Sequence, residues 1–421
     1  MAQKLKFGNG TWATKKGSTL AYNDENNNYK PLPFTTTRNS IATRVNKEGL
    51  IEVVGNDVPR IDYTDSADGV LLLEPSRTNA ATYSEAFDNS FWIKDNATVV
   101  GGYSAPDGSN NAFKLIEGTS NSQHNVKSSF ITTTNGSEIA ASVFVKADTR
   151  SEVSMQEAAY TGVYLSVDLI SETITTNGTS ANLTKLVNGW FRIDIISTCN
   201  IVTAWKIMPS LNGTSTYQGD GTSGIYIWGF QLEDVASYAT SYIPTNGSAV
   251  TRVADTATGA GNSEVFNDSE GVLFAEISAL ADDASYRILS LSDGTAANSI
   301  NIQYSNISNT IRTRIENGGA PKADISITLN IMLFNKISVL YKTDKFELWV
   351  NGFKVGEDLI GIPPSGINKL SFDRGDGLYD FYGKTKELGY YDTALTDEEL
   401  EYMTSYRTLR ELAEELNLNK L

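Results

Sequence analysis

Hydrophobic and polar residues alternate along many segments of the chain. Phe191, Ile193 and Ile195, for example, alternate with Arg192 and Asp194. Successive side chains of a strand point to opposite faces, so this period of two predicts a strand with one buried face. Short turns separate such segments and no helical pattern intervenes, which favours packed antiparallel sheets. We therefore predict a mainly β fold.

The clearest pair of strands lies at 345–350 and 353–355. Between them stands Asn351-Gly352, a dipeptide that readily supplies the two positive φ angles of a type I′ turn. Because the twist of this turn matches the twist of paired strands, the segment predicts a two-residue β-hairpin.

A helix is predicted at the end of the chain. Thr396 and Glu399 have the spacing of a capping box. Hydrophobic residues then recur at alternating steps of four and three, at Tyr402, Tyr406, Leu409, Ala413 and Leu416. This seam either pairs with a neighbouring copy of the chain or folds back on its own domain, and it is too short to decide between the two.

The pattern divides the 421 residues into five parts. An extended N-terminal arm, too small to bury a core alone, covers 1–36, and a connecting β and loop region covers 37–79. Two antiparallel β-sandwich (jelly-roll) domains follow at 80–253 and 264–393. A C-terminal α-helix covers 394–421.

Acidic residues outnumber basic ones. The chain has 50 Asp and Glu against 34 Lys and Arg, which gives a net charge of −16. The resulting field repels phosphate groups, so neither a nucleic acid nor an anionic membrane is an expected partner. No run approaches the ~18 apolar residues of a membrane span, and the first residues lack the apolar core of a secretory signal. We expect synthesis in the cytosol and no membrane insertion.

Candidate catalytic residues are few. Cys199 is the single cysteine and His124 the single histidine, which excludes an intrachain disulfide and any site with two imidazoles. Glycoside hydrolysis needs only two facing carboxylates, and the acidic residues leave it open. Four of them lie in or beside apolar segments, where solvated strand edges explain them equally well: Glu233, Asp234, Glu276 and Asp376.

Metal binding has two candidate segments, and the smaller one is Asp373 with Asp376 near the end of the chain. Asp62, Asp65 and Asp68 place three carboxylates in a short turn, and such oxygen ligands suit Ca²⁺. Their spacing does not match an EF-hand loop, and a solvated turn accounts for them. We predict no metal and no cofactor.

Aromatic residues offer the remaining candidate ligand surface. Exposed rings beside hydroxyl, amide and carboxylate groups suit the apolar faces of sugars. Trp205 has polar neighbours, and Tyr160 and Tyr164 stand on either side of Thr161-Gly162-Val163. These three are the candidate glycan-binding residues, and the alternative for each is a place in the core or on a sheet face.

Seven segments carry a resemblance to a known family. They are NSIATRVN (39–46), GLIE (49–52), VPRIDY (58–63), LLLEPSRTN (71–79), YSEAF (83–87), IYIWGFQLE (225–233) and TSYIPT (240–245). With them, residues 39–255 resemble tailed-bacteriophage virion proteins, chiefly fibres and appendages with jelly rolls like carbohydrate-binding modules. Residues 265–393, with LGYYDTALTDEE at 388–399, are similar to laminin-G or concanavalin-like lectin sandwiches.

The resemblance implies a place on the virion surface and a host-surface glycan as partner, and it fixes no sugar-contacting residue. Our hypothesis is a non-enzymatic structural protein of a bacteriophage virion, a head or tail fibre made in the host cytoplasm. It would display its lectin-like domains as a homotrimer. Two alternatives stay open: a fibre-borne glycan depolymerase, and an architectural capsid decoration without a ligand.

The N-terminal arm has a role in this hypothesis. Phe7, Trp12 and Phe34 are hydrophobic residues in a segment that cannot bury them alone. Docking onto another virion protein of the capsid or tail would bury them, at about 25 cal/mol per Å² of apolar area. The alternative is an arm that packs along its own first domain.

Overall fold

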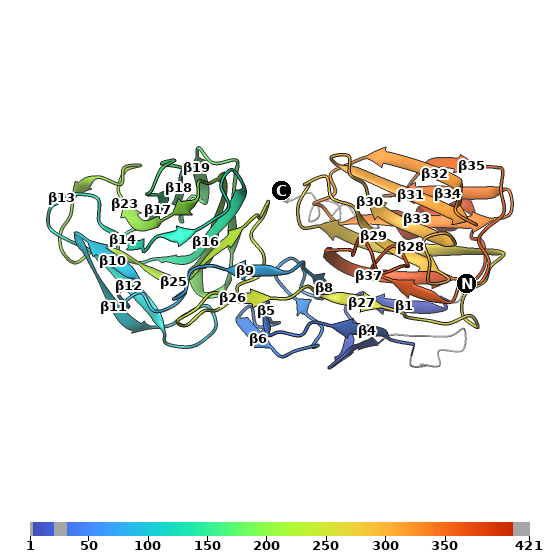
Figure 1. Cartoon of the computed structure of the whole chain (residues 1–421), viewed down its shortest axis with the longest axis horizontal. Coiled ribbons are helices and arrows are strands. Elements are labelled where there is room, and N and C mark those ends of the chain that lie inside the picture. Colours follow the sequence, from blue (N-terminus) through green and yellow to red (C-terminus); the bar gives the residue numbers. More distant parts are fainter. Residues whose placement is uncertain (1–2, 21–31, 407–421) are drawn as a thin grey trace. The chain divides into compact units, whose positions relative to one another are not determined.

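The computed structural model describes residues 3–20 and 32–406, and its paired strands form antiparallel sheets (Figure 1). The chain divides into two compact units. Unit 1 consists of Met1–Asn39, Gly55–Pro75 and Ala254–Leu421. Unit 2 consists of Ser40–Val54 and Ser76–Val253. The prediction of a mainly β chain with antiparallel β-sandwiches is confirmed.

In the part of unit 1 that the structure describes there are three sheets. The first has eight strands: β35 (Phe353–Asp358), β34 (Lys345–Val350), β33 (Asn335–Lys342), β28 (Glu270–Ala279), β37 (Gly383–Tyr391), β8 (Val70–Leu73), β7 (Ile61–Asp62) and β1 (Leu5–Gly8), which pairs with β37. The second has five: β32 (Ala320–Thr328), β31 (Thr310–Asn317), β30 (Ser299–Tyr304), β29 (Arg287–Ser292) and β36 (Lys369–Ser371). The third has four: β2 (Ala13–Lys15), β3 (Ser18–Leu20), β4 (Phe34–Thr37) and β27 (Thr256–Thr258).

The core of unit 1 comes from alternate residues of its two larger sheets. Leu273 and Ile277 of β28 pack in one cluster with Ile300 and Ile302 of β30, and all four are fully buried. One face of each strand contributes its side chains to this cluster, so the two sheets pack face to face as a sandwich.

The predicted hairpin at 345–355 is confirmed. Strand β34 pairs with β35 across Asn351 and Gly352, whose φ angles are 50° and 87°. Both residues therefore have the left-handed backbone that a type I′ turn requires.

The N-terminal arm is not an arm in the structure, and its predicted virion-anchoring residues are not free to anchor. Phe7 and Phe34 are each 1% exposed in the core of unit 1, with ring centroids 4.7 Å apart. Trp12 packs against the same core, and its Nε1 donates to the carbonyl of Gly69 at 3.0 Å. Phe7 and Phe34 are thus buried by the second sandwich, to which β1 adds a strand, and Trp12 is half-buried against it.

The connecting region predicted at 37–79 is divided between the two units. Its unit 1 part is fixed by buried charges. The Arg60 guanidinium pairs with Glu74 at 2.5 Å and also with Asp255, while Arg38 pairs with Asp255 at 3.0 Å. Burial opposes the charge of Arg60, but the two carboxylates outweigh it and raise its pKa. Two of the resemblance segments, VPRIDY and LLLEPSRTN, thus supply a structural ion cluster.

Unit 2 is built on two larger sheets. One has eight strands: β11 (Ala97–Tyr103), β12 (Ala112–Glu117), β25 (Gly224–Asp234), β16 (Glu138–Ala147), β21 (Trp190–Thr198) and β20 (Ser180–Lys185), joined by β9 (Arg77–Asn79) and β26 (Val250–Arg252). The other has six: β10 (Trp92–Asp95), β14 (Asn125–Ser128), β23 (Trp205–Ser210), β17 (Glu152–Glu157), β18 (Tyr164–Asp168) and β19 (Thr173–Thr176).

Three two-stranded ladders complete unit 2: β5 (Ala42–Val45) with β6 (Ile51–Val54), β13 (Asn121–Ser122) with β24 (Tyr217–Gln218), and β15 (Ile131–Thr132) with β22 (Val202–Thr203). A short 3₁₀ helix, η1, covers Val187–Gly189. Phe191, Ile193 and Ile195 of β21 are buried in the core between the larger sheets, as their alternation predicted.

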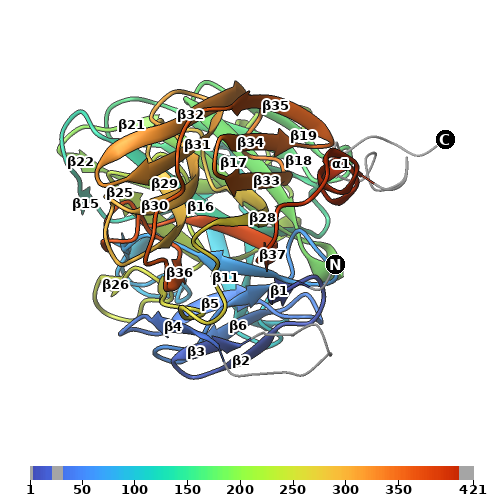
Figure 2. The same cartoon turned by 90° about the vertical axis from the view of Figure 1, so that its right-hand side faces the viewer.

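The C-terminal helix is shorter in the described residues than predicted. Helix α1 (Asp397–Thr404) has both hydrogen bonds of the capping box between Thr396 and Glu399. It packs beside β33 and β34 (Figure 2) and ends at Ser405, which is extended. The rest of the proposed seam, Leu409, Ala413 and Leu416, lies outside the described residues. Within the described ranges, no helix has the length and hydrophobicity to cross a bilayer.

Candidate functional site

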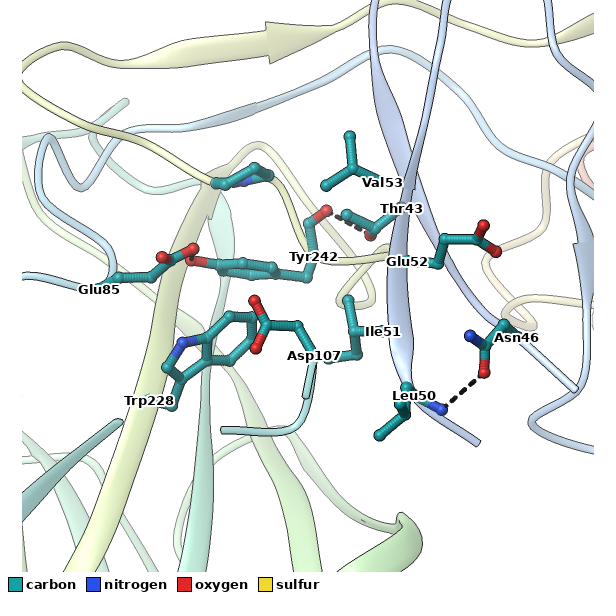
Figure 3. A pocket seen from close by; sticks show the side chains of 11 residues that line it. Thr43, Asn46, Leu50, Ile51, Glu52, Val53, Glu85, Asp107, Trp228 and Tyr242 are labelled. Atoms are coloured by element: carbon teal, nitrogen blue, oxygen red, sulfur yellow. Dashed lines mark hydrogen bonds between the residues drawn. The ribbon is translucent and has the colours of Figure 1, made fainter. Parts of the chain in front are cut away.

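A pocket of about 300 Å³ lies in unit 2 between the β5–β6 hairpin and the body of the sandwich (Figure 3). We call it the hairpin pocket. It is lined by Thr43, Asn46, Leu50, Ile51, Glu52, Val53, Glu85, Asp107, Trp228, Tyr242 and Pro244.

The hairpin forms one wall because a few contacts hold it to the sandwich. Thr43 Oγ1 donates to the carbonyl of Tyr242 at 2.6 Å, and Ile51 N donates to the carbonyl of Pro106 at 3.0 Å. The Ile51 side chain joins the small apolar cluster that contains Trp228 and Tyr242. These contacts anchor both strands of the hairpin.

Aromatic rings form the floor. Trp228 is on the long central strand β25, and its ring centroid is 4.7 Å from that of Tyr242 and 5.2 Å from that of Phe144. Trp228 Nε1 donates to Asn111 Oδ1 at 2.7 Å, which fixes the indole. The floor is therefore rigid and apolar.

Glu85 stands at the edge of this floor, at the hydroxyl end of Tyr242 (Figure 3). One carboxylate oxygen accepts from Tyr242 Oη at 2.9 Å and the other from Asn111 Nδ2 at 2.8 Å. Burial raises the pKa of Glu85, and the nearby charge of Asp107 adds to the rise, against the two hydrogen bonds. Burial and Glu85 likewise raise the pKa of Tyr242 well above its ordinary range.

Three polar residues surround the opening. Asp107 Oδ1 accepts from Ser109 N at 2.9 Å, and Asn46 Oδ1 accepts from Leu50 N at 2.9 Å. Glu52 pairs with Arg44 at 2.9 Å. Hydrogen-bonding oxygens thus surround a floor of tilted aromatic rings, an arrangement suited to a small polyhydroxyl ligand.

Almost the whole pocket comes from segments that carry the resemblance. Asn46 lies in NSIATRVN, Glu52 in GLIE, Glu85 in YSEAF, Trp228 in IYIWGFQLE and Tyr242 in TSYIPT. These segments come from three separate stretches of the sequence, 39–52, 83–87 and 225–245, and converge on one cavity. Asp107 and Val53 are the lining residues outside them.

Trp205 cannot be a glycan platform, so this prediction is wrong. The ring is 0% exposed and packs in the unit 2 core with Ile207. Its neighbour Lys206 points to the opposite face of β23 and donates to Gln123 at 2.8 Å. Lys206 is polar because it lies on the other face of the strand, so a polar neighbour does not indicate that Trp205 is exposed.

Tyr160 and Tyr164 are solvent-exposed, by 64% and 37%, and do not line the pocket. The loop that carries Tyr160 is held by Glu157, whose carboxylate accepts from the backbone N–H groups of Ala159, Tyr160 and Thr161 at 2.7–2.9 Å. Burial opposes the charge of Glu157, but these bonds outweigh it and lower its pKa. The role of the two tyrosines in glycan binding stays a prediction.

The other candidates from the sequence have structural partners. Glu233 is buried and accepts from Thr240 N at 2.8 Å, and Asp376 pairs with Arg374 at 2.6 Å. Asp65 pairs with Lys384. Among the residues that the structure describes, no group of three His, Cys, Asp or Glu side chains is placed to hold a metal ion.

No family model matches the chain, and no curated protein does either. Among solved structures, the CBM40 domain of a Ruminococcus gnavus IT-sialidase, bound to α2,3-sialyllactose, is 17% identical with a TM-score of 0.30, over 35% of this chain and 94% of that one. A SAP-like pentraxin from Limulus polyphemus is 14% identical (TM-score 0.27; 34% and 72% covered). A proposed carbohydrate-binding protein from Bacteroides ovatus is 11% identical (TM-score 0.26; 68% and 80%).

Proposed function

We propose that this chain is a glycan-binding protein and that the hairpin pocket of unit 2 is its site. The observation that carries this proposal is the aromatic floor, formed by the tilted rings of Trp228 and Tyr242 with centroids 4.7 Å apart, beneath a rim of carboxylate and amide oxygens. The apolar C–H face of a sugar ring suits such a floor, and its hydroxyl groups suit such a rim.

The size of the pocket supports a small ligand. At about 300 Å³ it stands at the lower end of the roughly 300–1,000 Å³ of small-molecule sites. It therefore suits one sugar unit, such as the end or a branch of a longer glycan.

Blocking the pocket tests the proposal. Val53 lines it and is 57% exposed, so Val53→Trp fills the opening without disturbing the core. We expect loss of glycan-array signal and of calorimetric binding. Ile41→Trp, at a 46% exposed position just before β5, is the matched control and should bind as the native chain does. Equal binding by both variants would exclude the pocket.

Glycan hydrolysis is the second candidate function, because Glu85 and Asp107 place two acids in one cavity. A carboxyl group with a raised pKa is what a general acid needs. Both Glu85 oxygens, however, already accept hydrogen bonds within the chain, and this favours a binding role. Incubation with capsular polysaccharides, followed by sizing of the chains, separates the functions: shorter products that Glu85→Gln abolishes would establish an enzyme.

We further propose that the glycan site belongs to a bacteriophage virion, as part of a homotrimeric head or tail fibre. This proposal rests on the sequence resemblance of residues 39–255. Attachment to the virion then has to use surfaces other than Phe7 and Phe34, which are buried. Electron microscopy of labelled particles tests the location, and light scattering tests the trimer. An architectural protein without a ligand would give no glycan-array signal.

A further inference from the structure

The charges that line the hairpin pocket have one sign. Glu52, Glu85 and Asp107 contribute carboxylates, and no lysine or arginine lines it. Glu52 is paired with Arg44, which lies outside the lining. Neither Glu85 nor Asp107 has an ion-pair partner among the described residues. The cavity therefore has an uncompensated negative potential.

The hydrogen-bond donors of the lining are largely used within the chain. Trp228 Nε1 donates to Asn111, the Tyr242 hydroxyl donates to Glu85 and also lies 2.7 Å from Ser84 Oγ, and Thr43 Oγ1 donates to a backbone carbonyl. What remains for a ligand is mostly acceptor oxygen, including Asp107 Oδ2. Asn46 Nδ2 is the exception, because among the described residues only the oxygen of that amide has a hydrogen-bond partner.

Such a site needs a ligand that brings donors. Sugar hydroxyl and amine groups donate hydrogen bonds, whereas a carboxylate, sulfate or phosphate group only accepts them. An acid group in this small cavity would also face Asp107 and Glu85, with no cation between them. The resulting repulsion would disfavour an acidic ligand strongly relative to a neutral one.

We infer that the hairpin pocket takes sugars that carry hydroxyl or amine donors and no acid group, and that it rejects uronic and sialic acids. The inference rests on the proposed glycan-binding function and adds the class of sugar. The carboxylates of the lining thus discriminate between hexoses that differ in carrying an acid group.

Two matched series of methyl glycosides test it on the full chain: glucose, glucosamine and glucuronic acid, and the galactose counterparts. We expect the neutral or amino member of at least one series to bind, and its uronic acid to bind at least about tenfold more weakly, a difference of about 1.4 kcal/mol. A uronic acid that binds as tightly as its neutral counterpart would overturn the inference and leave the glycan site standing. If no glycoside of either series binds and the glycan array is blank, the proposed function and this inference fail together.

Charge reversal supplies the second test. Asp107→Lys should reduce the preference for the neutral sugar by about tenfold or more, and Glu48→Lys, at an exposed position of the same hairpin outside the pocket, should leave it unchanged. Added salt should weaken the native preference, since screening reduces the repulsion. An unchanged preference in Asp107→Lys, with binding retained, would contradict the electrostatic origin.

Discussion

The aromatic side chains of unit 2 divide into rings that close the core and rings that reach solvent. Trp205 is in the first group and Tyr160 in the second. Trp228 belongs with the buried rings, since it is 1% exposed, and its side chain also lines the floor of the pocket. The effect of a single substitution on stability therefore depends on how deeply the side chain is buried.

Trp205→Ala should destabilise unit 2 by about 3–5 kcal/mol, since a fully buried indole would leave a large cavity. Tyr160→Ala should change the stability by less than about 0.5 kcal/mol, because the ring is mostly solvated. Urea denaturation, with hydrogen exchange to assign the change to unit 2, measures both. Equal effects of the two substitutions would contradict the assignment of Trp205 to the core.

Glu85 makes the stability of unit 2 depend on pH. A raised pKa means that the folded chain holds this proton more tightly than the unfolded chain, so the stability it contributes is present at low pH and is lost as the pH rises. Glu85→Gln cannot ionise. We expect the unfolding free energy of Glu85→Gln, relative to that of the native chain, to increase between about pH 4 and about pH 7. Urea titrations at both pH values, with Glu48→Gln as the matched control, test this; a constant difference would contradict it.

At the scale of elements, β1 is part of the large sheet of unit 1. It pairs with β37 over Leu5–Gly8, and Phe7 fills the core beside Phe34. A segment that looks dispensable in sequence therefore completes a sandwich.

Phe7→Ala should lower the unfolding free energy of unit 1 by about 3–5 kcal/mol, as for other buried rings. The neighbouring Lys6, whose side chain is 38% exposed, provides the control, and Lys6→Ala should cost less than about 0.5 kcal/mol. Thermal unfolding of both variants measures the difference. A small effect of Phe7→Ala would restore the view of this segment as a detachable arm.

Local signals in the sequence were sufficient to predict individual elements. The Asn351-Gly352 turn and the Thr396–Glu399 cap each depend on residues within a few positions, and both are present as predicted. The place of β1 was not predictable in this way, because its partner β37 is more than 370 residues further along the chain and nothing local specifies such pairing.

The candidate site could be predicted only in part, for the same reason. Its residues lie in the segments that carry the resemblance, but Trp228 stands among apolar residues of IYIWGFQLE and is 1% exposed, so nothing local distinguishes it from a core residue. The pocket arises when the hairpin at 40–54 meets Tyr242 and Glu85, which are distant in sequence. The site is defined by contacts between residues that are distant in the sequence, and neither composition nor periodicity indicates such contacts.

At the scale of the whole molecule, the two units are interleaved along the chain. It passes from one unit to the other four times, near residues 39, 54, 75 and 253. Each unit is therefore assembled from segments that parts of the other unit separate in the sequence. No single cut in the chain yields two complete units.

A fragment of residues 264–421, which follows the predicted domain boundary, should fail to fold cooperatively. It lacks β1, β7 and β8 of the eight-stranded sheet and would expose Leu388 and its neighbours. Circular dichroism during heating, with the full chain as reference, tests this. A sharp transition in the fragment would show that the N-terminal strands are dispensable.

The assignment of both β1 and α1 to unit 1 has a mechanical consequence. A tensile force transmitted through the backbone on either side of these two elements enters and leaves the same folded body. Unit 1 bears that load, and unit 2 stays unloaded for as long as unit 1 holds. A ligand in the hairpin pocket would then be retained while the remainder of the chain is under strain.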